Sequence, residues 1–400
     1  MKRIRIGLFG AIINNDNMGC CALTFSLIRL LENIVDERDC NVEYVIFERW
    51  PDEKKIEELC ELLAISKNKV SSAKSIRFSK IYRLDQFKEF LKEIEKCDYA
   101  IDITQGDSFT DIYGIKRFFA FSFDKLMVQH KKVPLILGPQ TYGPFQKGIS
   151  KKIARRIINH SHCVFSRDNY SIEYLEKQLK IKKSMIQVTD LAFGLPYHDT
   201  VRFQGKNVGL NVSGLLWPQK TESTVTAFSL ACDYKQFIFD TVSYLENEGY
   251  CIHLISHVGA DMSACEQVHK EYPNTILVPE FENPILAKSY ISAMDLFIGA
   301  RMHATIAALS SFVPVIPVSY SRKFQGLFQS IGYPICLDVL NWDTKCAVDY
   351  LKLQVESIDE LKQAVVLAKK RSEEEYQTMA TKIADCIMDK VSIDFRDEEE

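Results

Sequence analysis

Residues 295–309 decide the fold expected of this chain: Asp295-Leu296-Phe297-Ile298-Gly299-Ala300-Arg301-Met302-His303-Ala304-Thr305-Ile306-Ala307-Ala308-Leu309. An apolar strand runs directly into Arg301 and His303, and an apolar helix starts behind them. Both residues therefore fall at the edge where open α/β sheets bind ligands. The start of a helix adds N–H groups and the positive end of a dipole. Together these features suit a small anion that carries both phosphate and carboxylate.

The composition is that of a globular protein. The chain has 400 residues, of which 46% are apolar, and a net charge of −3. This length and composition can build two domains with full cores. Nothing in the charge favours nucleic acid as a partner. The apolar part of the amino terminus is too short for a signal peptide, and we expect no run of about 18 apolar residues that would span a membrane. We therefore expect a cytoplasmic protein.

The twelve cysteines are scattered along the chain and none forms a Cys-x-x-Cys motif. We expect them to be reduced and mostly buried. His160, His162 and Cys163 are candidate metal ligands, because the two histidines share one face of a predicted strand. No third ligand follows at a motif spacing, so no metal site is predicted.

Short β-rich runs alternate with amphipathic helical patterns, which is the βαβ signature of a parallel sheet with helices on both faces. The predicted fold class is α/β, with two Rossmann-like domains that face each other across a cleft. We expect an amino-terminal domain at 1–195, a linker at 195–206, and a carboxyl-terminal domain at 206–355. A final helical pattern at 356–393 is expected to pack back on the first domain.

Several other polar residues follow predicted strands and are candidates for the same cleft. Asn17 lies in a loop that lines the cleft or forms an ordinary turn. Asp107 and Asp111 follow the strand at 99–103, and each is a candidate for a general base or for gripping sugar hydroxyls. Helix capping is the alternative for Asp111.

Four further residues are candidates. Tyr142 lies in a loop with two Gly-Pro pairs, which forms part of the site or a structural turn. Arg167 either points into the cleft, with Asp168 capping the next helix, or forms a surface pair with that residue. His257 follows a strand, although a lone histidine is more often structural. Lys323 would add positive charge beside His303.

Taken together, these segments resemble the polysaccharide pyruvyl transferase family from about residue 5 to residue 333. The strongest match is Gly299-Ala300-Arg301-Met302-His303-Ala304, followed by a proline-containing strand and Tyr320-x-x-Lys323-x-x-Gly326. The segments 138–145, 166–168 and 188–193 match in order. Two departures stand out: Cys20 replaces the acidic residue of the family's Asn-x-Gly-Asp loop, and Gln105-Gly106-Asp107 replaces a triple glycine.

The resemblance implies a fold similar to the two-domain GT-B glycosyltransferases. It also implies phosphoenolpyruvate as donor and a sugar of a bacterial surface glycan as acceptor. The product would be a pyruvate ketal bridging two hydroxyls, with phosphate released. No cofactor or metal is required in this scheme, because arginines supply the positive charge.

The residues then take roles in a hypothetical mechanism. Arg301, Met302, Arg167 and Lys323 bind the donor, because guanidinium groups match its phosphate and carboxylate. His303 is the general acid and Asp107 the base. The expected acceptor contacts are made by Asn17, Asp111, Tyr142 and His257.

Other functions and partners stay open at this stage. A GT-B nucleotide-sugar glycosyltransferase and a non-catalytic sugar- or phosphate-binding protein are the alternatives, since one fold hosts many functions. The acceptor is expected to be lipid-linked. Peripheral membrane docking through Lys147, Lys151, Lys152, Arg155 and Arg156 is one interpretation of that basic stretch, and a solvated helix face is the other. A homo-oligomer is also compatible with the sequence.

Overall fold

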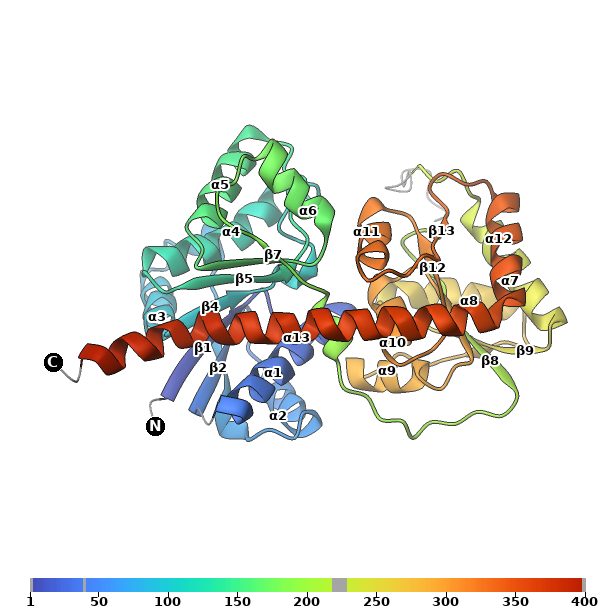
Figure 1. The fold of residues 1–400 in the computed structure, drawn as a ribbon, viewed down its shortest axis with the longest axis horizontal. Coiled ribbons are helices and arrows are strands. Elements are labelled where there is room, and N and C mark those ends of the chain that lie inside the picture. Colours follow the sequence, from blue (N-terminus) through green and yellow to red (C-terminus); the bar gives the residue numbers. More distant parts are fainter. Residues whose placement is uncertain (1–2, 39–40, 218–228, 398–400) are drawn as a thin grey trace. The chain divides into compact units, whose positions relative to one another are not determined.

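The structure is a computed structural model that describes residues 3–38, 41–217 and 229–397. Side chains are described over the same ranges except at 36–38, 322–323 and 388–397. The chain divides into two compact units. Unit 1 contains residues 1–14, 23–191 and 374–400, and unit 2 contains residues 15–22 and 192–373. Each unit is built on one parallel sheet (Figure 1).

The sheet of unit 1 has seven strands in the order β3-β2-β1-β4-β5-β6-β7. All neighbouring pairs within it are parallel. Its central strands are buried along most of their length, which requires apolar side chains on both faces. The bounds are β1 Arg3–Phe9, β2 Asn41–Glu48, β3 Val70–Lys74, β4 Tyr99–Asp102, β5 Leu135–Gln140, β6 Cys163–Ser166 and β7 Ile186–Gln187.

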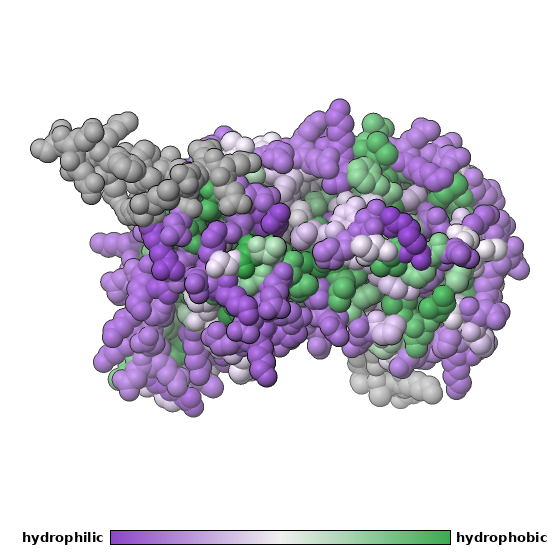
Figure 2. All heavy atoms as spheres, turned by 90° about the horizontal axis from the view of Figure 1, so that it is seen from below, coloured by the Kyte–Doolittle hydropathy of each residue, from purple (hydrophilic) through white to green (hydrophobic). Residues whose placement is uncertain are grey.

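Helices connect the strands of unit 1 in the βαβ manner. They are α1 Met18–Arg38, α2 Glu53–Leu62, α3 Leu84–Glu95, α4 Ile115–His130, α5 Gly148–Asn159 and α6 Asn169–Glu173, which continues as a π-helical turn at Tyr174–Gln178. An aromatic cluster forms much of the core, with Phe9 stacked on Phe47 and Phe109 stacked on Phe118. Hydrophilic residues cover most of the face of this unit that Figure 2 presents.

The sheet of unit 2 has six parallel strands in the order β10-β9-β8-β11-β12-β13. Its strands are β8 Lys206–Asn211, β9 Tyr250–Leu254, β10 Ile276–Leu277, β11 Leu296–Gly299, β12 Val315–Ser319 and β13 Leu337–Asp338. The helices are α7 Tyr234–Asn247, α8 Met262–Glu271, α9 Pro284–Ile291, α10 Met302–Ser310, α11 Arg322–Ser330, α12 Thr344–Glu356 and α13 Ile358–Asp397. In both sheets the strand order reverses beside the first strand, which creates a switch point at the carboxyl edge.

The predicted α/β architecture with two Rossmann-like sheets is confirmed. The boundary between the units falls at Leu191, close to the predicted linker, and the part of α13 from Glu374 onward belongs to unit 1. The sequence missed β3, β10 and β13. All three lie at sheet edges, where one side of a strand lacks a partner and the apolar pattern is weak.

Two expectations about the chain were wrong. The first was that the chain has no apolar run long enough to span a membrane. By length and composition, residues Met18–Val35 of α1 form such a run. Most of that stretch is buried inside the structure, as in the core helix of a folded domain. Its apolar character therefore reflects packing, because a helix surrounded by protein needs no polar face.

The second expectation was that all cysteines are reduced. Cys163 at the start of β6 and Cys386 in α13 form a disulfide, with their Cα atoms 6.9 Å apart. The other nine cysteines that the structure describes are not in disulfides, and most are buried. Sequence spacing could not predict the partner of Cys163, because 223 residues separate the two cysteines. Cys163 and Cys386 lie beside His162, so Cys386 is the third potential metal ligand that spacing in the sequence did not reveal. In the disulfide, however, neither sulfur is a thiolate that could bind a metal.

Candidate active site

Arg301 and His303 lie where the sequence predicts, at the carboxyl end of β11 and the start of α10. Arg301 has an extended backbone and immediately precedes the helix. Its backbone N–H donates to the side chain of Asn211 at 2.9 Å, at the end of the neighbouring strand β8. The two strands are in register at Gly299 and Asn211, so the side chain of one strand end holds the backbone of the other.

Asp261 orients the guanidinium of Arg301. Nη2 of Arg301 is 2.6 Å from Oδ1 of Asp261, and Nε is 3.1 Å from both carboxylate oxygens. Among the described residues, Nη1 donates to none. The Arg301 side chain is 16% exposed and Asp261 is fully buried. One edge of the guanidinium is thus fixed inside the protein, and the remaining N–H groups can meet a ligand.

Asp261 also ties together the loops around this arginine. It accepts hydrogen bonds from the backbone N–H groups of Gly214 at 2.8 Å and Val258 at 3.2 Å. These bonds join the segments that follow β8 and β9. Burial would lower the pKa of Arg301, but the hydrogen bond and charge of Asp261 outweigh it, so the pKa is raised. The guanidinium therefore stays charged at any physiological pH.

Gly19 packs directly on the imidazole of His303. A Cβ placed on Gly19 would stand 2.2 Å from Nδ1 of His303, far inside van der Waals contact. Only a residue without a side chain allows this approach. The backbone of the first loop therefore forms one wall against the ring and restricts its orientation.

Asn17 supports this wall through its side chain. Its side-chain oxygen accepts from the backbone N–H of Gly19 at 3.0 Å. The loop is also joined to the segment after β9, because Met18 donates its N–H to the carbonyl of His257 at 3.1 Å. We therefore reassign Asn17 from acceptor contact to a residue that positions Gly19. Cys20, where the family has an acidic residue, is buried in the first turn of α1.

His257 is buried beside His303 and Arg301. Only 4% of it is exposed, and among the described residues neither ring nitrogen has a hydrogen-bond partner. Burial first, and then the positive charges of His303 and Arg301, lower the pKa of His257 to about 3. The ring is therefore neutral near pH 7 and carries one N–H donor and one acceptor nitrogen. It belongs to the same cluster as the predicted donor residues, whereas the sequence suggested an acceptor contact.

Arg167 occupies the corresponding edge of the unit 1 sheet but is enclosed by protein. It is 2% exposed, its Nη1 is 2.5 Å from Oδ2 of Asp190, and its Nε donates to Thr141 at 3.0 Å. Burial would lower the pKa of Arg167, but the carboxylates of Asp190, Asp107 and Asp168 together raise it. The prediction that Arg167 points outward to bind the donor disagrees with this burial. The alternative pair with Asp168 is also wrong, because Asp168 caps α6.

The tight turn at Thr104–Gly106 explains one departure from the family pattern. Gln105 has a positive φ of 52°, a conformation that glycine adopts without strain. Gly106 is retained, and a Cβ there would lie 2.9 Å from Nη1 of Arg167. The chain therefore keeps glycine where the close approach demands it. The strain of a side chain at Gln105 costs about 1 kcal/mol.

Two predicted acceptor-binding residues form hydrogen bonds within the protein. Asp111 accepts from the backbone N–H groups of Gln146 at 2.7 Å and Lys147 at 2.9 Å, just before α5. The capping alternative is therefore the better interpretation of this residue. Tyr142 is 2% exposed and donates its hydroxyl to the carbonyl of Phe165 at 2.8 Å. Both polar groups therefore make hydrogen bonds within unit 1.

The remaining candidates differ in how they are placed. Asp107 follows the tight turn and is partly exposed, and it accepts from the hydroxyl of Tyr113 at 2.8 Å. Met302 is the first residue of α10 and is half-buried. Lys323 lies in α11, but its side chain falls outside the described ones.

Sequence reasoning missed two residues of the unit 2 cluster. Asp261 and Asn211 are both buried polar residues at the carboxyl edge, and each holds Arg301. A signal existed for Asp261, since it follows a buried strand in the same loop as His257. Asn211 ends an apolar strand, where an amide side chain needs a partner.

Comparison with known proteins supports the family resemblance of the sequence. The family model described as polysaccharide pyruvyl transferase matches residues 54–322. The amylovoran biosynthesis protein AmsJ of Erwinia amylovora is 22% identical over 273 residues, which is 62% of this chain and 63% of that protein. This chain therefore aligns with less than two thirds of that relative's length.

Three solved structures with a similar fold are distant from this chain in sequence. S. aureus MnaA with UDP has a TM-score of 0.60 at 11% identity, covering 98% of this chain and 97% of that one. The UDP-GlcNAc 2-epimerase of Neisseria meningitidis has a TM-score of 0.60 at 8% identity, with 97% and 100% coverage. Anabaena HepE with UDP and glucose has a TM-score of 0.58 at 9% identity, with 96% and 100% coverage. These similarities establish a GT-B-like fold and nothing about the ligand.

The family model covers well over half of the chain, including the Arg301–His303 segment and the loop that holds Asp261. The chain belongs to the polysaccharide pyruvyl transferase family.

Proposed function

We propose that this protein transfers the pyruvyl group of phosphoenolpyruvate to two hydroxyls of one sugar in a bacterial surface polysaccharide precursor. The product is a cyclic ketal, and inorganic phosphate is released. The observation that carries this proposal is the pair Arg301 and His303 at the start of α10, with Asp261 fixing the guanidinium. A cation, an imidazole and helix N–H groups are complementary to a donor that bears phosphate and carboxylate.

The proposed reaction has two stages. Protonation of the donor methylene makes the adjacent carbon oxocarbenium-like, and a first sugar hydroxyl attacks that carbon and loses its proton. The carbon–oxygen bond to phosphate then breaks, and a second hydroxyl attacks and closes the ring. One proton ends on the new methyl group. The other leaves with phosphate, so the two hydroxyl protons balance the reaction.

His303 is the proposed general acid, because its ring stands against Gly19 at the helix start in a restricted orientation. Arg301 binds the anionic donor with the N–H groups that Asp261 leaves available. Neutral His257 adds one hydrogen-bond donor to the same cluster. In this proposal, buried Arg167 organises the edge of unit 1 and does not touch the donor.

Asp107 of unit 1 stays our candidate for the base that takes a hydroxyl proton. Its carboxylate is partly exposed, and Tyr113 fixes one oxygen. We also propose that the acceptor is lipid-linked and that the protein works in the cytoplasm. Phosphoenolpyruvate is a co-substrate in this scheme, and no cofactor is needed.

The direct test is incubation of the purified protein with phosphoenolpyruvate and a β-galactoside or N-acetylmannosamine acceptor. We expect release of phosphate that depends on the acceptor, and a product whose mass includes one pyruvyl ketal. A parallel incubation replaces phosphoenolpyruvate with a UDP-sugar. Transfer from the UDP-sugar would support the glycosyltransferase alternative. Binding of phosphoenolpyruvate without any turnover would support a non-catalytic protein.

A further inference from the structure

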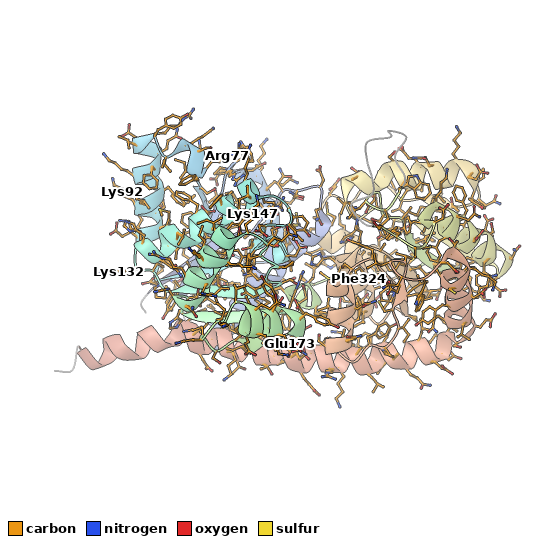
Figure 3. The ribbon with its side chains drawn as sticks, turned by 90° about the horizontal axis from the view of Figure 1, so that it is seen from above. Arg77, Lys92, Lys132, Lys147, Glu173 and Phe324 are labelled. Atoms are coloured by element: carbon orange, nitrogen blue, oxygen red, sulfur yellow. A yellow bond between two sulfur atoms is a disulfide. The ribbon has the colours of Figure 1, made fainter. Side chains whose placement is uncertain are left out.

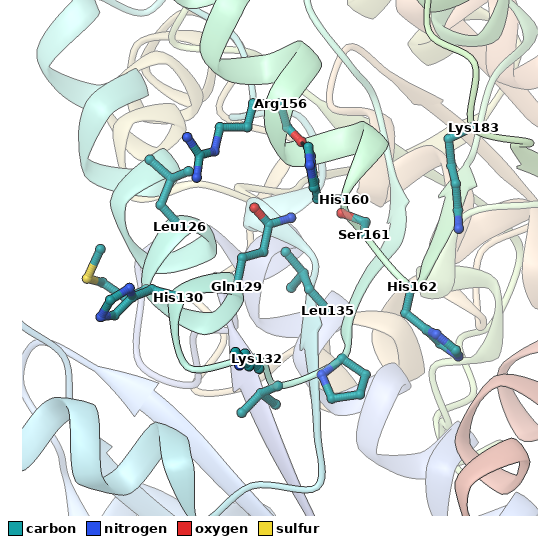
Figure 4. A pocket seen from close by; sticks show the side chains of 13 residues that line it. Leu126, Gln129, His130, Lys132, Leu135, Arg156, His160, Ser161, His162 and Lys183 are labelled. Atoms are coloured by element: carbon teal, nitrogen blue, oxygen red, sulfur yellow. Dashed lines mark hydrogen bonds between the residues drawn. The ribbon is translucent and has the colours of Figure 1, made fainter.

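Unit 1 contains a pocket of about 750 Å³ that the proposed reaction does not use. It lies between the end of α4, the end of α5 and the segments that lead into β5, β6 and β7 (Figure 4). Its side chains include Gln129 and His130 from α4 and Arg156 from α5. The volume is in the range of pockets that hold small organic ligands.

The pocket is lined by cationic and imidazole groups without counter-charges. Arg156, Lys132 and Lys183 contribute permanent charges, and His130, His160 and His162 contribute imidazoles. No aspartate or glutamate is among the lining residues. In the described part of the chain, the cationic groups of Arg156, Lys132 and Lys183 have no hydrogen-bond or ion-pair partner. The like charges around this hollow repel one another, and a bound anion would neutralise them.

The surrounding sequence has the same bias. From Lys125 to Arg167 there are nine lysines and arginines and no aspartate or glutamate, although the whole chain has a net charge of −3. Lys125 and Arg167 are buried in ion pairs with Asp102 and Asp190. Of the other seven, Lys131 forms an ion pair with Glu95 at 3.0 Å, and the remaining six, among them Lys132 and Lys147 (Figure 3), are exposed. A local positive field of this kind attracts anions.

This pocket is separate from the edge that carries Arg167. His162 and Lys183 precede β6 and β7, whereas Arg167 follows β6. Because the strands are parallel, the pocket lies at the amino edge of the sheet. β6 alone has four residues, which correspond to about 13 Å at roughly 3.3 Å per residue.

We propose that this amino-edge pocket binds a diphosphate-bearing ligand. Three permanent charges match the two or three charges of a diphosphate better than those of one carboxylate. The planar guanidinium of Arg156 can contact two phosphate oxygens, and the lysines act as point charges. The remaining volume accommodates the group attached to the diphosphate. The ligand is either a soluble nucleoside diphosphate or the headgroup of a polyprenyl diphosphate lipid.

The test uses the full chain and calorimetric titration with inorganic pyrophosphate at about 0.15 M salt, where weak surface charge effects are screened. The pocket variant is Arg156→Gln combined with Lys183→Gln. The matched control is Lys92→Gln, which removes an exposed, unpaired lysine on α3 of the same unit (Figure 3). An Arg301→Gln protein identifies any pyrophosphate bound at the proposed donor site. Circular dichroism shows that each variant is folded.

We expect the pocket variant to bind pyrophosphate at least roughly tenfold more weakly than the wild type, because it loses charge-assisted hydrogen bonds. The Lys92→Gln and Arg301→Gln proteins should keep this binding component. Equal binding by the pocket variant and the wild type would overturn the proposal, and so would citrate binding as tightly as pyrophosphate.

Two further titrations identify the source of the diphosphate. Uridine diphosphate represents a soluble ligand, and phosphatidylcholine vesicles with added polyprenyl diphosphate represent a lipid. Binding of either one that is lost in the pocket variant supports the proposal. If the pocket variant binds both ligands as well as the wild type does, the proposal is overturned. Phosphate release from phosphoenolpyruvate with a soluble acceptor should be unchanged in the pocket variant, so a failure here is distinct from a failure of the proposed function.

Discussion

The backbone of Gly19 lies against the ring of His303, so closely that a Cβ on Gly19 would be 2.2 Å from Nδ1. The two residues are far apart in the sequence and belong to the same unit. The first loop is therefore part of the wall around the proposed general acid. In the proposed reaction, glycine at this position therefore has a positioning role that its own chemistry does not suggest.

Replacing Gly19 by alanine should lower turnover. The new methyl group must displace the His303 ring, because the atoms cannot approach to that distance. The matched control is Gly148→Ala, where an added Cβ meets nothing within 4 Å. Phosphate release should fall by at least roughly tenfold in Gly19→Ala and stay near normal in the control. Equal rates would mean that the ring orientation is irrelevant to the chemistry.

Replacing His303 by alanine should reduce turnover by about 10²–10⁴-fold, which is the usual contribution of a general acid. Thermal unfolding should change little, because the ring is only half-buried. The measurement is phosphate release under saturating phosphoenolpyruvate. Near-normal release by a folded His303→Ala protein would show that another group delivers the proton.

Asp261→Asn should affect both stability and donor binding. The change removes the charge partner of Arg301 while Asp261 is fully buried, and breaking such a pair costs about 3–5 kcal/mol. Denaturant unfolding measures this loss, and the KM for phosphoenolpyruvate should rise because the guanidinium is no longer held. A double variant with Arg301→Met completes a mutant cycle. If the two effects simply add, the residues do not act as a pair.

Lys288 should make stability depend on pH. This lysine is 2% exposed, its Nζ donates to the carbonyl of Leu195, and burial followed by the charge of Lys369 lowers its pKa to about 7. Between about pH 7 and pH 10 the unfolded chain binds a proton that the folded chain does not. The free energy of unfolding should therefore rise with pH in that window, by about 1 kcal/mol per pH unit.

The measurement for Lys288 compares wild type and Lys288→Met by urea unfolding at several pH values. The difference between the two should change with pH, while a surface control, Lys92→Met, should run parallel to the wild type. Parallel curves for Lys288→Met would show that the lysine keeps its proton when buried.

Cys386→Ser should loosen the carboxyl-terminal part of α13. The disulfide with Cys163 closes a long stretch of chain, and losing such a bond typically costs about 2–5 kcal/mol. Limited proteolysis should cut α13 faster in the variant and in the reduced wild type. Cys346→Ser, at an exposed free cysteine, is the control and should behave like the wild type. Identical digestion patterns would show that packing alone holds the helix.

The sequence by itself determined the alternation of strands and helices, the position of Arg301 and His303 at a strand-to-helix junction, and the family. These features depend on local patterns: apolar runs mark buried strands, and polar residues at their ends mark the ligand edge. Only the tertiary structure decided which polar groups pair. It placed Asp261 on Arg301, Gly19 on His303, Asp190 on Arg167 and Cys386 on Cys163. Each of these contacts joins residues distant in the chain, so neither periodicity nor spacing carries a signal for it. Both arginines pair with a buried carboxylate, and they differ in exposure: the side chain of Arg301 is 16% exposed and that of Arg167 is 3% exposed. Exposure of this kind depends on the packing around a side chain, which the local sequence does not encode.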